Sequence, residues 1–214
     1  MIIAIDGPSA SGKSTTAKGV ASRLSITHLN TGAMYRAVTW AIREHGIDIR
    51  DKSKLDEFLN SVKISFDQFN NICISGKDVS KEISSTDISI MVSSVSAIPE
   101  IREKMVQIQR IISGKKDCVL EGRDIGTVVF PNAEYKFYLV ADTLVRAKRR
   151  YLELKENGEN CTLDAIIKNI NDRDERDSTR KHSPLLQAED AILIDTSKLT
   201  LDEQIEKIVN IVIQ

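Results

Sequence analysis

The sequence predicts an α/β fold with helices on both faces of a doubly wound parallel sheet. Short apolar stretches at residues 2–5, 117–121 and 135–140 are typical of buried parallel strands, and longer stretches with helical patterning separate them. A glycine-rich loop at residues 7–14 joins the first of these strands to a helix. Between residues 61 and 79, apolar and polar residues alternate instead, which predicts a small antiparallel sheet inserted into the fold.

The composition indicates one continuous domain, residues 1–214, without a targeting or membrane segment. The 214 residues suffice for a sizeable core, and no stretch approaches the ~20 apolar residues of a membrane-spanning helix. The net charge of −1 argues against nonspecific attraction to nucleic acid or membranes. Cys73, Cys118 and Cys161 lack the spacing of a metal site, so reduced thiols in a cytoplasmic protein are expected.

Helix boundaries in the sequence support this alternation. Thr31 is expected to cap a helix, and Gly46 follows its end. Pro99 suits the first position of another helix, and Asp142 is expected to open a third. In chain order, the remaining expectations are a helix at 13–24, a strand at 26–29, an insertion at 61–98, a strand at 191–195 and a helix at 201–212.

The loop after the first strand matches the phosphate-binding pattern G-x-x-x-x-G-K-[ST]. Its glycines let backbone N–H groups turn toward phosphate oxygens, and the following helix N-terminus adds partial positive charge. Lys13 is expected to reach the β- and γ-phosphates of ATP, and Ser14 to ligate Mg²⁺. The expected ATP-binding residues are Gly7, Pro8, Ser9, Ala10, Ser11, Gly12, Lys13, Ser14 and Thr15.

This loop alone does not separate kinases from GTPases, motors or ATP sensors. The guanine-reading N-K-x-D and the switch D-x-x-G of GTPases do not occur in the sequence, and the chain is short for a motor module. A small kinase is therefore favoured. Its alternatives are a P-loop kinase with a different acceptor and a noncatalytic ATP-binding module.

Arginines at helical spacing dominate the last third of the chain. One group is Arg146, Arg149 and Arg150, and the other is Arg173, Arg176 and Arg180, with Asp177 on the same face as the second. Such groups often form solvated salt bridges. In a phosphoryl-transfer enzyme, however, guanidinium groups are needed around the transferred charge. We therefore interpret both groups as candidate phosphate-binding sites.

Four stretches in the same order resemble the bacterial cytidylate kinase family, whose members phosphorylate CMP and dCMP. They are residues 5–15, 30–36 (Asn-Thr-Gly-Ala-Met-Tyr-Arg), 121–131 (Glu-Gly-Arg-Asp-Ile-Gly-Thr-Val-Val-Phe-Pro) and 173–180, the last followed by Ser-Pro-Leu at 183–185. The resemblance covers nearly the whole chain. It implies that the insertion at 61–98 belongs to the monophosphate-binding region and that a mobile helical lid lies at about 149–161.

The resemblance also implies a role for each matching residue. The CMP phosphate would be held by Thr31, Arg36, Arg123 and Arg180. The cytosine edge would be read by Ser93, Arg102 and Asp124, and the pentose would be contacted by Arg173 and Asp177. Arg149 and Arg150 belong to the lid, and with Lys13, Arg123, Arg173, Arg176 and Arg180 they form the expected catalytic set. One departure is Asn30, where the family commonly has aspartate, so a role that requires a carboxylate there is in doubt.

The expected reaction transfers the γ-phosphoryl of ATP, with Mg²⁺, to CMP or dCMP in pyrimidine nucleotide metabolism. The acceptor phosphate is already ionised, so no general base is needed, and His28, His45 and His182 are interpreted as structural or surface residues. Catalysis would rest on positioning and charge stabilisation, with lid closure excluding water. The expected partners are these small-molecule substrates, and the expected state is a monomer.

Overall fold

The structure, a computed structural model, describes residues 1–114, 116–156 and 158–214. It contains two compact units. The first comprises Met1–Leu29 and the described part of Lys115–Gln214, and the second comprises Asn30–Gly114. The expectation of a single domain with an insertion at 61–98 stays a prediction.

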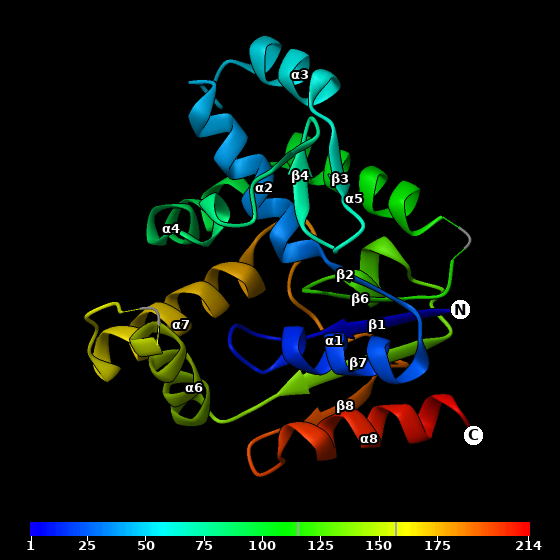
Figure 1. Cartoon of the computed structure of the whole chain (residues 1–214). Coiled ribbons are helices and arrows are strands. Elements are labelled where there is room, and N and C mark those ends of the chain that lie inside the picture. Colours follow the sequence, from blue (N-terminus) through cyan, green and yellow to red (C-terminus); the bar gives the residue numbers. More distant parts are fainter. Residues whose placement is uncertain (115, 157) are drawn as a thin grey trace. The chain divides into compact units, whose positions relative to one another are not determined.

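The first unit is built on a five-stranded sheet in the order β2-β6-β1-β7-β8 (Figure 1). β1 pairs in parallel with both β6 and β7, and β7 pairs in parallel with β8. The doubly wound α/β prediction is therefore confirmed. The strands are β1 (Ile2–Asp6), β2 (Thr27–Asn30), β6 (Cys118–Gly122), β7 (Tyr135–Val140) and β8 (Ile192–Asp195).

The central position of β1 determines where the functional loops emerge. Ile3, Ala4 and Ile5 are fully buried, as expected for a strand with a neighbour on each side. Asp6 at its carboxyl end lies opposite Gly122 of β6 and Tyr138 of β7. The glycine loop and the segment that follows β6 therefore leave the sheet side by side, at the edge where α/β proteins bind ligands.

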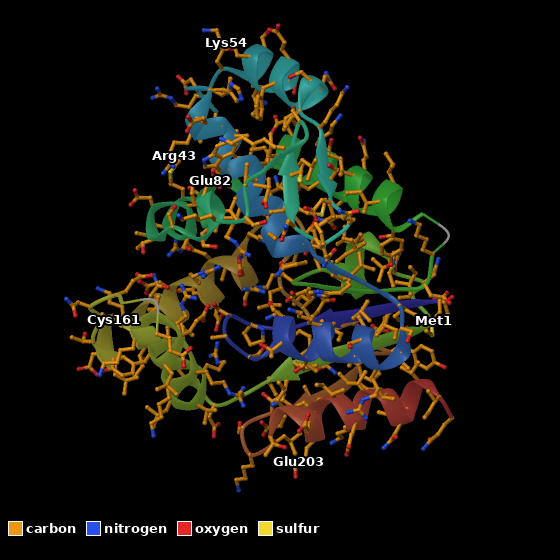
Figure 2. All side chains as sticks on the ribbon, in the orientation of Figure 1. Met1, Arg43, Lys54, Glu82, Cys161 and Glu203 are labelled. Atoms are coloured by element: carbon orange, nitrogen blue, oxygen red, sulfur yellow. The ribbon has the colours of Figure 1, made fainter. Side chains whose placement is uncertain are left out.

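Helix α1 (Lys13–Leu24) packs against α8 (Leu201–Val212), and both contribute to the core that covers β1 and β7. A capping box between Thr200 and Glu203 fixes the start of α8, at the end of the helix where Figure 2 labels Glu203. The contact between the two helices is close, because a Cβ placed on Gly19 would lie 2.2 Å from Ile205 Cδ1.

Replacing Gly19 by alanine should therefore destabilise the protein, although alanine is the better helix former. We expect the overpacking to lower the free energy of unfolding by about 1–3 kcal/mol, measured by urea denaturation. The matched variant Gly19→Ala/Ile205→Val removes the clashing methyl group and should recover part of that loss. An alanine variant as stable as the parent would contradict the prediction.

Helices α6 (Thr143–Glu156) and α7 (Leu163–Thr179) form a hairpin that contains the expected lid (Figure 1). Ala147, Ile166 and Ile170 pack between the two helices, and Cys161 lies in their connection (Figure 2). Residue 157 of the expected lid lies outside the described residues. Because α7 ends at Thr179, the assumed helical continuation to Arg180 was wrong: Arg180 caps the helix with extended backbone angles.

The second unit combines helices with the predicted antiparallel sheet, which has the order β3-β4-β5. The helix at 52–61 was not predicted. Asn30, rather than Thr31, caps α2, since its side chain accepts a hydrogen bond from the Ala33 N–H at 2.8 Å. The elements are α2 (Thr31–Glu44), α3 (Lys52–Ser61), β3 (Ile64–Phe66), β4 (Ile72–Ile74), β5 (Lys77–Asp78), a 3₁₀ turn (Glu82–Ser84), α4 (Thr86–Val95) and α5 (Pro99–Ser113).

Candidate active site

The glycine loop wraps around the side chain of Lys13. Lys13 is buried, and its Nζ donates to the Pro8 carbonyl at 2.5 Å and contacts Ser11 Oγ at 3.3 Å. Burial lowers the pKa of Lys13 well below its ordinary value, and the nearby Arg123 guanidinium lowers it further. The loop thus holds a desolvated amine whose present partners are loop atoms, so an anion entering the loop would gain a strong interaction.

Two helical residues bind both backbone groups of Ser9 in this loop. The Ser9 N–H donates to Asp174 Oδ1 at 2.8 Å, and the Ser9 carbonyl accepts from Arg146 Nη1 at 3.0 Å. Arg146 and Asp174 also pair with each other. Because Arg146 is buried and engaged with loop backbone, it supports the loop, and its interpretation as a phosphate ligand is not favoured.

Arg149 reaches the loop from α6 through Thr196. Its guanidinium donates to the Thr196 carbonyl at 2.7 Å and to Thr196 Oγ1 at 3.0 Å, while the Thr196 hydroxyl in turn donates to Ser11 O at 3.1 Å. A Cβ on Gly12 would lie 3.6 Å from Arg149 Nη1. The structure therefore places Arg149 beside the glycine loop.

Ser14 contacts a carboxylate that the sequence analysis did not select. Its hydroxyl donates to Glu121 Oε2 at 2.6 Å, and His28 Nε2 lies 3.3 Å from Glu121 Oε1. Burial raises the pKa of Glu121, but the contacts with His28 and Ser14 outweigh it and leave the pKa below its ordinary value. An ionised carboxylate beside a serine hydroxyl is an oxygen donor set of the kind that Mg²⁺ prefers. No larger cluster of His, Cys, Asp or Glu suited to a metal occurs in the described residues.

Asp6 joins the glycine loop to the segment after β6. Its two carboxylate oxygens accept the backbone N–H groups of Ile125 at 2.9 Å and Gly126 at 2.7 Å. These residues begin a π-helical turn, Ile125–Val129, an irregularity frequent at functional sites. Burial raises the pKa of Asp6 to about 6, although both backbone hydrogen bonds oppose the shift. Asp6 therefore orients Arg123 and Asp124, which directly precede this turn.

The raised pKa of Asp6 predicts a pH-dependent stability. Below pH 4 the carboxyl is protonated in both states. Between pH 4 and 6 only the unfolded chain ionises, so the free energy of unfolding falls as pH rises, by on the order of 3 kcal/mol from this group. The test is urea denaturation of the parent and of Asp6→Asn at pH 4, 5, 6 and 7. The free energy of unfolding of Asp6→Asn should not show this decrease, so the variant should become more stable relative to the parent at each higher pH. A constant difference between variant and parent would contradict the prediction.

Four predicted acceptor-site residues of the first unit form one charged cluster. Arg123 Nε donates to Asp177 Oδ2 at 2.9 Å, and Arg180 lies 3.5 Å from Asp177 Oδ1 and 3.9 Å from Asp124 Oδ1. The Arg180 side chain is only 8% exposed, and Arg180 Nε also donates to the Ser183 carbonyl. Two guanidinium groups and two carboxylates thus share a nearly buried site beside the glycine loop.

The remaining arginines of the expected catalytic set are Arg150, Arg173 and Arg176. Arg150 pairs with Glu153 at 2.8 Å on the surface of α6. Arg176 is exposed, and its Nε donates to the Asp172 carbonyl within α7 at 2.9 Å. Arg173 is half-buried on α7. The catalytic role of these three arginines stays a prediction.

The other predicted acceptor residues lie in the second unit. Thr31 is buried in the first turn of α2, and the Arg36 side chain lies near Gly32, one turn earlier. Ser93 is half-buried on α4. Arg102 is only 3% exposed, donates to the Ser96 carbonyl at 2.9 Å, and stacks over the Tyr35 ring at 5.3 Å. Arg102 is therefore held rigidly within this unit.

Sequence reasoning missed Asp6, Glu121, Asp174 and Thr196 as site residues. Asp6 and Glu121 carried a usable signal, because each is an acidic residue at the carboxyl end of an apolar strand. Asp174 and Thr196 carried none, since their partners lie 165 and 185 residues away along the chain.

The comparison with known proteins agrees with this arrangement. The chain is similar to a cytidylate kinase from Clostridium botulinum strain Okra, with 48% identity over 98% of this chain and 96% of the relative. It is 46% identical to a cytidylate kinase from Alkaliphilus oremlandii and 44% identical to one from Clostridioides difficile, each over 98% of this chain and at least 96% of the relative.

Among solved structures, an uncharacterized protein from Eubacterium ventriosum has a similar fold. The two structures match with a TM-score of 0.54 and 16% sequence identity. The match covers 100% of this chain and 99% of that protein. A family model described as cytidylate kinase matches residues 3–214. With that match over nearly all of its length, the chain belongs to the cytidylate kinase family.

Proposed function

We propose that this protein transfers the γ-phosphoryl group of ATP to CMP or dCMP, giving ADP and CDP or dCDP. One observation carries the proposal. The glycine loop with its buried Lys13 lies beside the cluster of Arg123, Asp177, Arg180 and Asp124, close enough for Arg123 to lower the pKa of Lys13. A phosphate donor site and an acceptor site that contains two arginines thus adjoin at one edge of the sheet.

In this mechanism the chain positions the reactants and stabilises negative charge. The acceptor oxygen is ionised at neutral pH, so no side chain has to remove a proton. Lys13 moves from the Pro8 carbonyl to the β- and γ-phosphates, while Arg123 and Arg180 hold the CMP phosphate in line with the donor. Arg149 and Arg150 approach the transferred group when the hairpin of α6 and α7 closes, and Arg173 and Arg176 add positive charge from α7.

Ser14 and Glu121 would hold Mg²⁺. The serine hydroxyl and the ionised carboxylate already lie 2.6 Å apart, so both oxygens converge on one place. Bound there, the ion would neutralise charge on the β- and γ-phosphate oxygens. The backbone N–H groups of residues 7–15 would surround the same phosphates.

Selection of the acceptor would rest on buried polar groups. Asp124 and Ser93 can accept from the cytosine amine, and Arg102 can donate to the cytosine carbonyl oxygen O2 or to the ring nitrogen N3. Uracil presents a carbonyl instead of the amine and would leave Asp124 and Ser93 without a hydrogen-bond donor, so UMP should react more slowly. Thr31 and Arg36 would bind the monophosphate, and Arg173 and Asp177 the pentose without requiring its 2′-hydroxyl.

We further propose that the enzyme acts as a cytoplasmic monomer. Cys73, Cys118 and Cys161 are thiols that form no disulfide within the described part of the chain, which suits a reducing compartment. Among the residues that the structure describes, no helix combines the length and the apolar character needed to cross a membrane.

The test is a coupled assay of ADP formation with ATP, Mg²⁺ and one acceptor at a time. We expect fast turnover with CMP and dCMP, slower turnover with UMP, and none with AMP, GMP or shikimate. Turnover with another acceptor would favour a P-loop kinase of different specificity, and ATP binding without transfer would favour a noncatalytic module. Arg180→Ala should reduce kcat/KM for CMP by about 100-fold or more, whereas the exposed control Arg23→Ala should not.

A further inference from the structure

His28 lies where it can act on the proposed metal site without touching the metal. It lies on β2, and its Nε2 is 3.3 Å from Glu121 Oε1. The side chain of His28 is 11% exposed and that of Glu121 is 5% exposed, so little water competes for their contact. Ser14, on the first turn of α1, donates to the other oxygen, Oε2. One carboxylate is thus approached from two sides by residues of two different elements.

A carboxylate needs two such contacts to keep one orientation. The terminal torsion of glutamate is broad and roughly two-fold, so a hydrogen bond to one oxygen alone leaves the group free to rotate. A ring nitrogen beside the second oxygen removes that freedom. Imidazole is also stiff, with two side-chain torsions, so its position follows directly from the backbone of β2. The orientation of Oε2 toward Ser14 therefore depends on His28 as well as on Ser14.

We propose that His28 is a positioning residue that orients the Glu121 carboxylate toward Ser14 and thereby sets the affinity of the enzyme for the Mg²⁺ that accompanies ATP. The inference rests on the proposed function, in which Ser14 and Glu121 hold the ion. It replaces the expectation that His28 is only structural. Groups that orient metal-ligating carboxylates typically change metal affinity by 10–100-fold when removed.

The two interpretations of His28 predict different results. A merely structural histidine would, when replaced, lower the stability of the fold and leave the metal affinity of the folded protein unchanged. A positioning histidine would weaken metal binding at constant ADP affinity. It would also make the effect depend on whether the replacement places a nitrogen where Nε2 lies, since that atom approaches Glu121.

The experiment uses three replacements in the full chain. His28→Gln places an amide nitrogen near the position of Nε2, His28→Asn carries the same amide one methylene too short, and His28→Leu fills the space without a polar group. The probe is Mn²⁺, whose binding to the enzyme–ADP complex is followed by electron paramagnetic resonance. ADP affinity without metal and the thermal midpoint are measured in parallel.

We expect the dissociation constant for Mn²⁺ to rise about 10-fold in His28→Leu and His28→Asn and to stay within about three-fold of the parent in His28→Gln. In the Glu121→Gln background, His28→Leu should have little further effect, because the two residues act through one contact. Equal Mn²⁺ affinity in all three variants, or additive effects in the double variant, would overturn the proposal.

Failure of the proposed function would look different. If the parent shows no ADP formation that depends on CMP or dCMP, the proposed reaction is wrong whatever His28 does to Mn²⁺ binding. If the parent phosphorylates CMP and the variants His28→Asn and His28→Gln bind Mn²⁺ equally well, the proposed reaction is supported and the proposed role of His28 is wrong. The Asn and Gln pair keeps the test valid even if His28→Leu does not fold.

Discussion

Replacing Lys13 by alanine should lower kcat by at least about 100- to 1,000-fold while leaving the protein at least as stable as the parent. The loss follows because Lys13 is the cation that the glycine loop encloses, and a preorganised charge in a water-poor site acts strongly on a developing phosphate charge. Stability is kept because the buried ammonium is desolvated in the free enzyme, so its removal also removes the desolvation cost of a buried charge.

The measurement pairs steady-state turnover of CMP with thermal unfolding. The matched control is Lys18→Ala, on the same helix but exposed, which should change neither quantity appreciably. A Lys13 variant that unfolds at a much lower temperature would show that the amine stabilises the loop. A variant with near-parental kcat would remove Lys13 from the mechanism.

Replacing Gly7 by alanine should be the most destructive single change to the fold. A Cβ at this position would lie 2.1 Å from the Leu139 carbonyl oxygen, and the atom that blocks it belongs to the backbone of β7. Neither partner can rotate away, so the first residue of the loop would have to separate from the sheet. We expect a loss in the free energy of unfolding of more than about 4 kcal/mol, in the range of severe core changes, with little folded protein recovered.

Gly46→Ala separates steric clash from backbone strain. Gly46 has a φ of +60° with no atom within 4 Å of its added Cβ, so alanine there suffers only the left-handed conformation. That strain amounts to about 1–2 kcal/mol. Urea denaturation should therefore rank parent, Gly46→Ala and Gly7→Ala in order of falling stability. Similar values for the two variants would contradict the clash at Leu139.

Much of the sheet was predictable because its strands are short, apolar and bounded by glycine or charge. The helix Lys52–Ser61 was missed although Asp51 caps it and Leu55, Phe58 and Leu59 share one face. Three apolar residues in ten give a weak pattern, and so short a helix depends on the rest of its unit. Its partner α5 comes about forty residues later.

The site was predictable where its residues are close together in the sequence. It was not predictable where the tertiary fold brings distant residues together. Gly7, Gly12, Lys13 and Ser14 lie within eight residues, so their pattern alone indicates a phosphate loop. The prediction that Arg180 shares a helix face with Arg173 and Arg176 was wrong, because the helix ends one residue earlier, at Thr179.

The double hold on Ser9 constrains how this enzyme can change over evolution. Arg146 from α6 binds the backbone carbonyl of Ser9, Asp174 from α7 binds its backbone N–H, and the two side chains also pair with each other. Losing either one leaves a buried charge without its counterpart, a change of about 3–5 kcal/mol. The pair should therefore be inherited as a unit, and relatives that lack the arginine should lack the aspartate as well. Substitutions in the hairpin should be tolerated at its exposed positions and rare at Arg146 and Asp174.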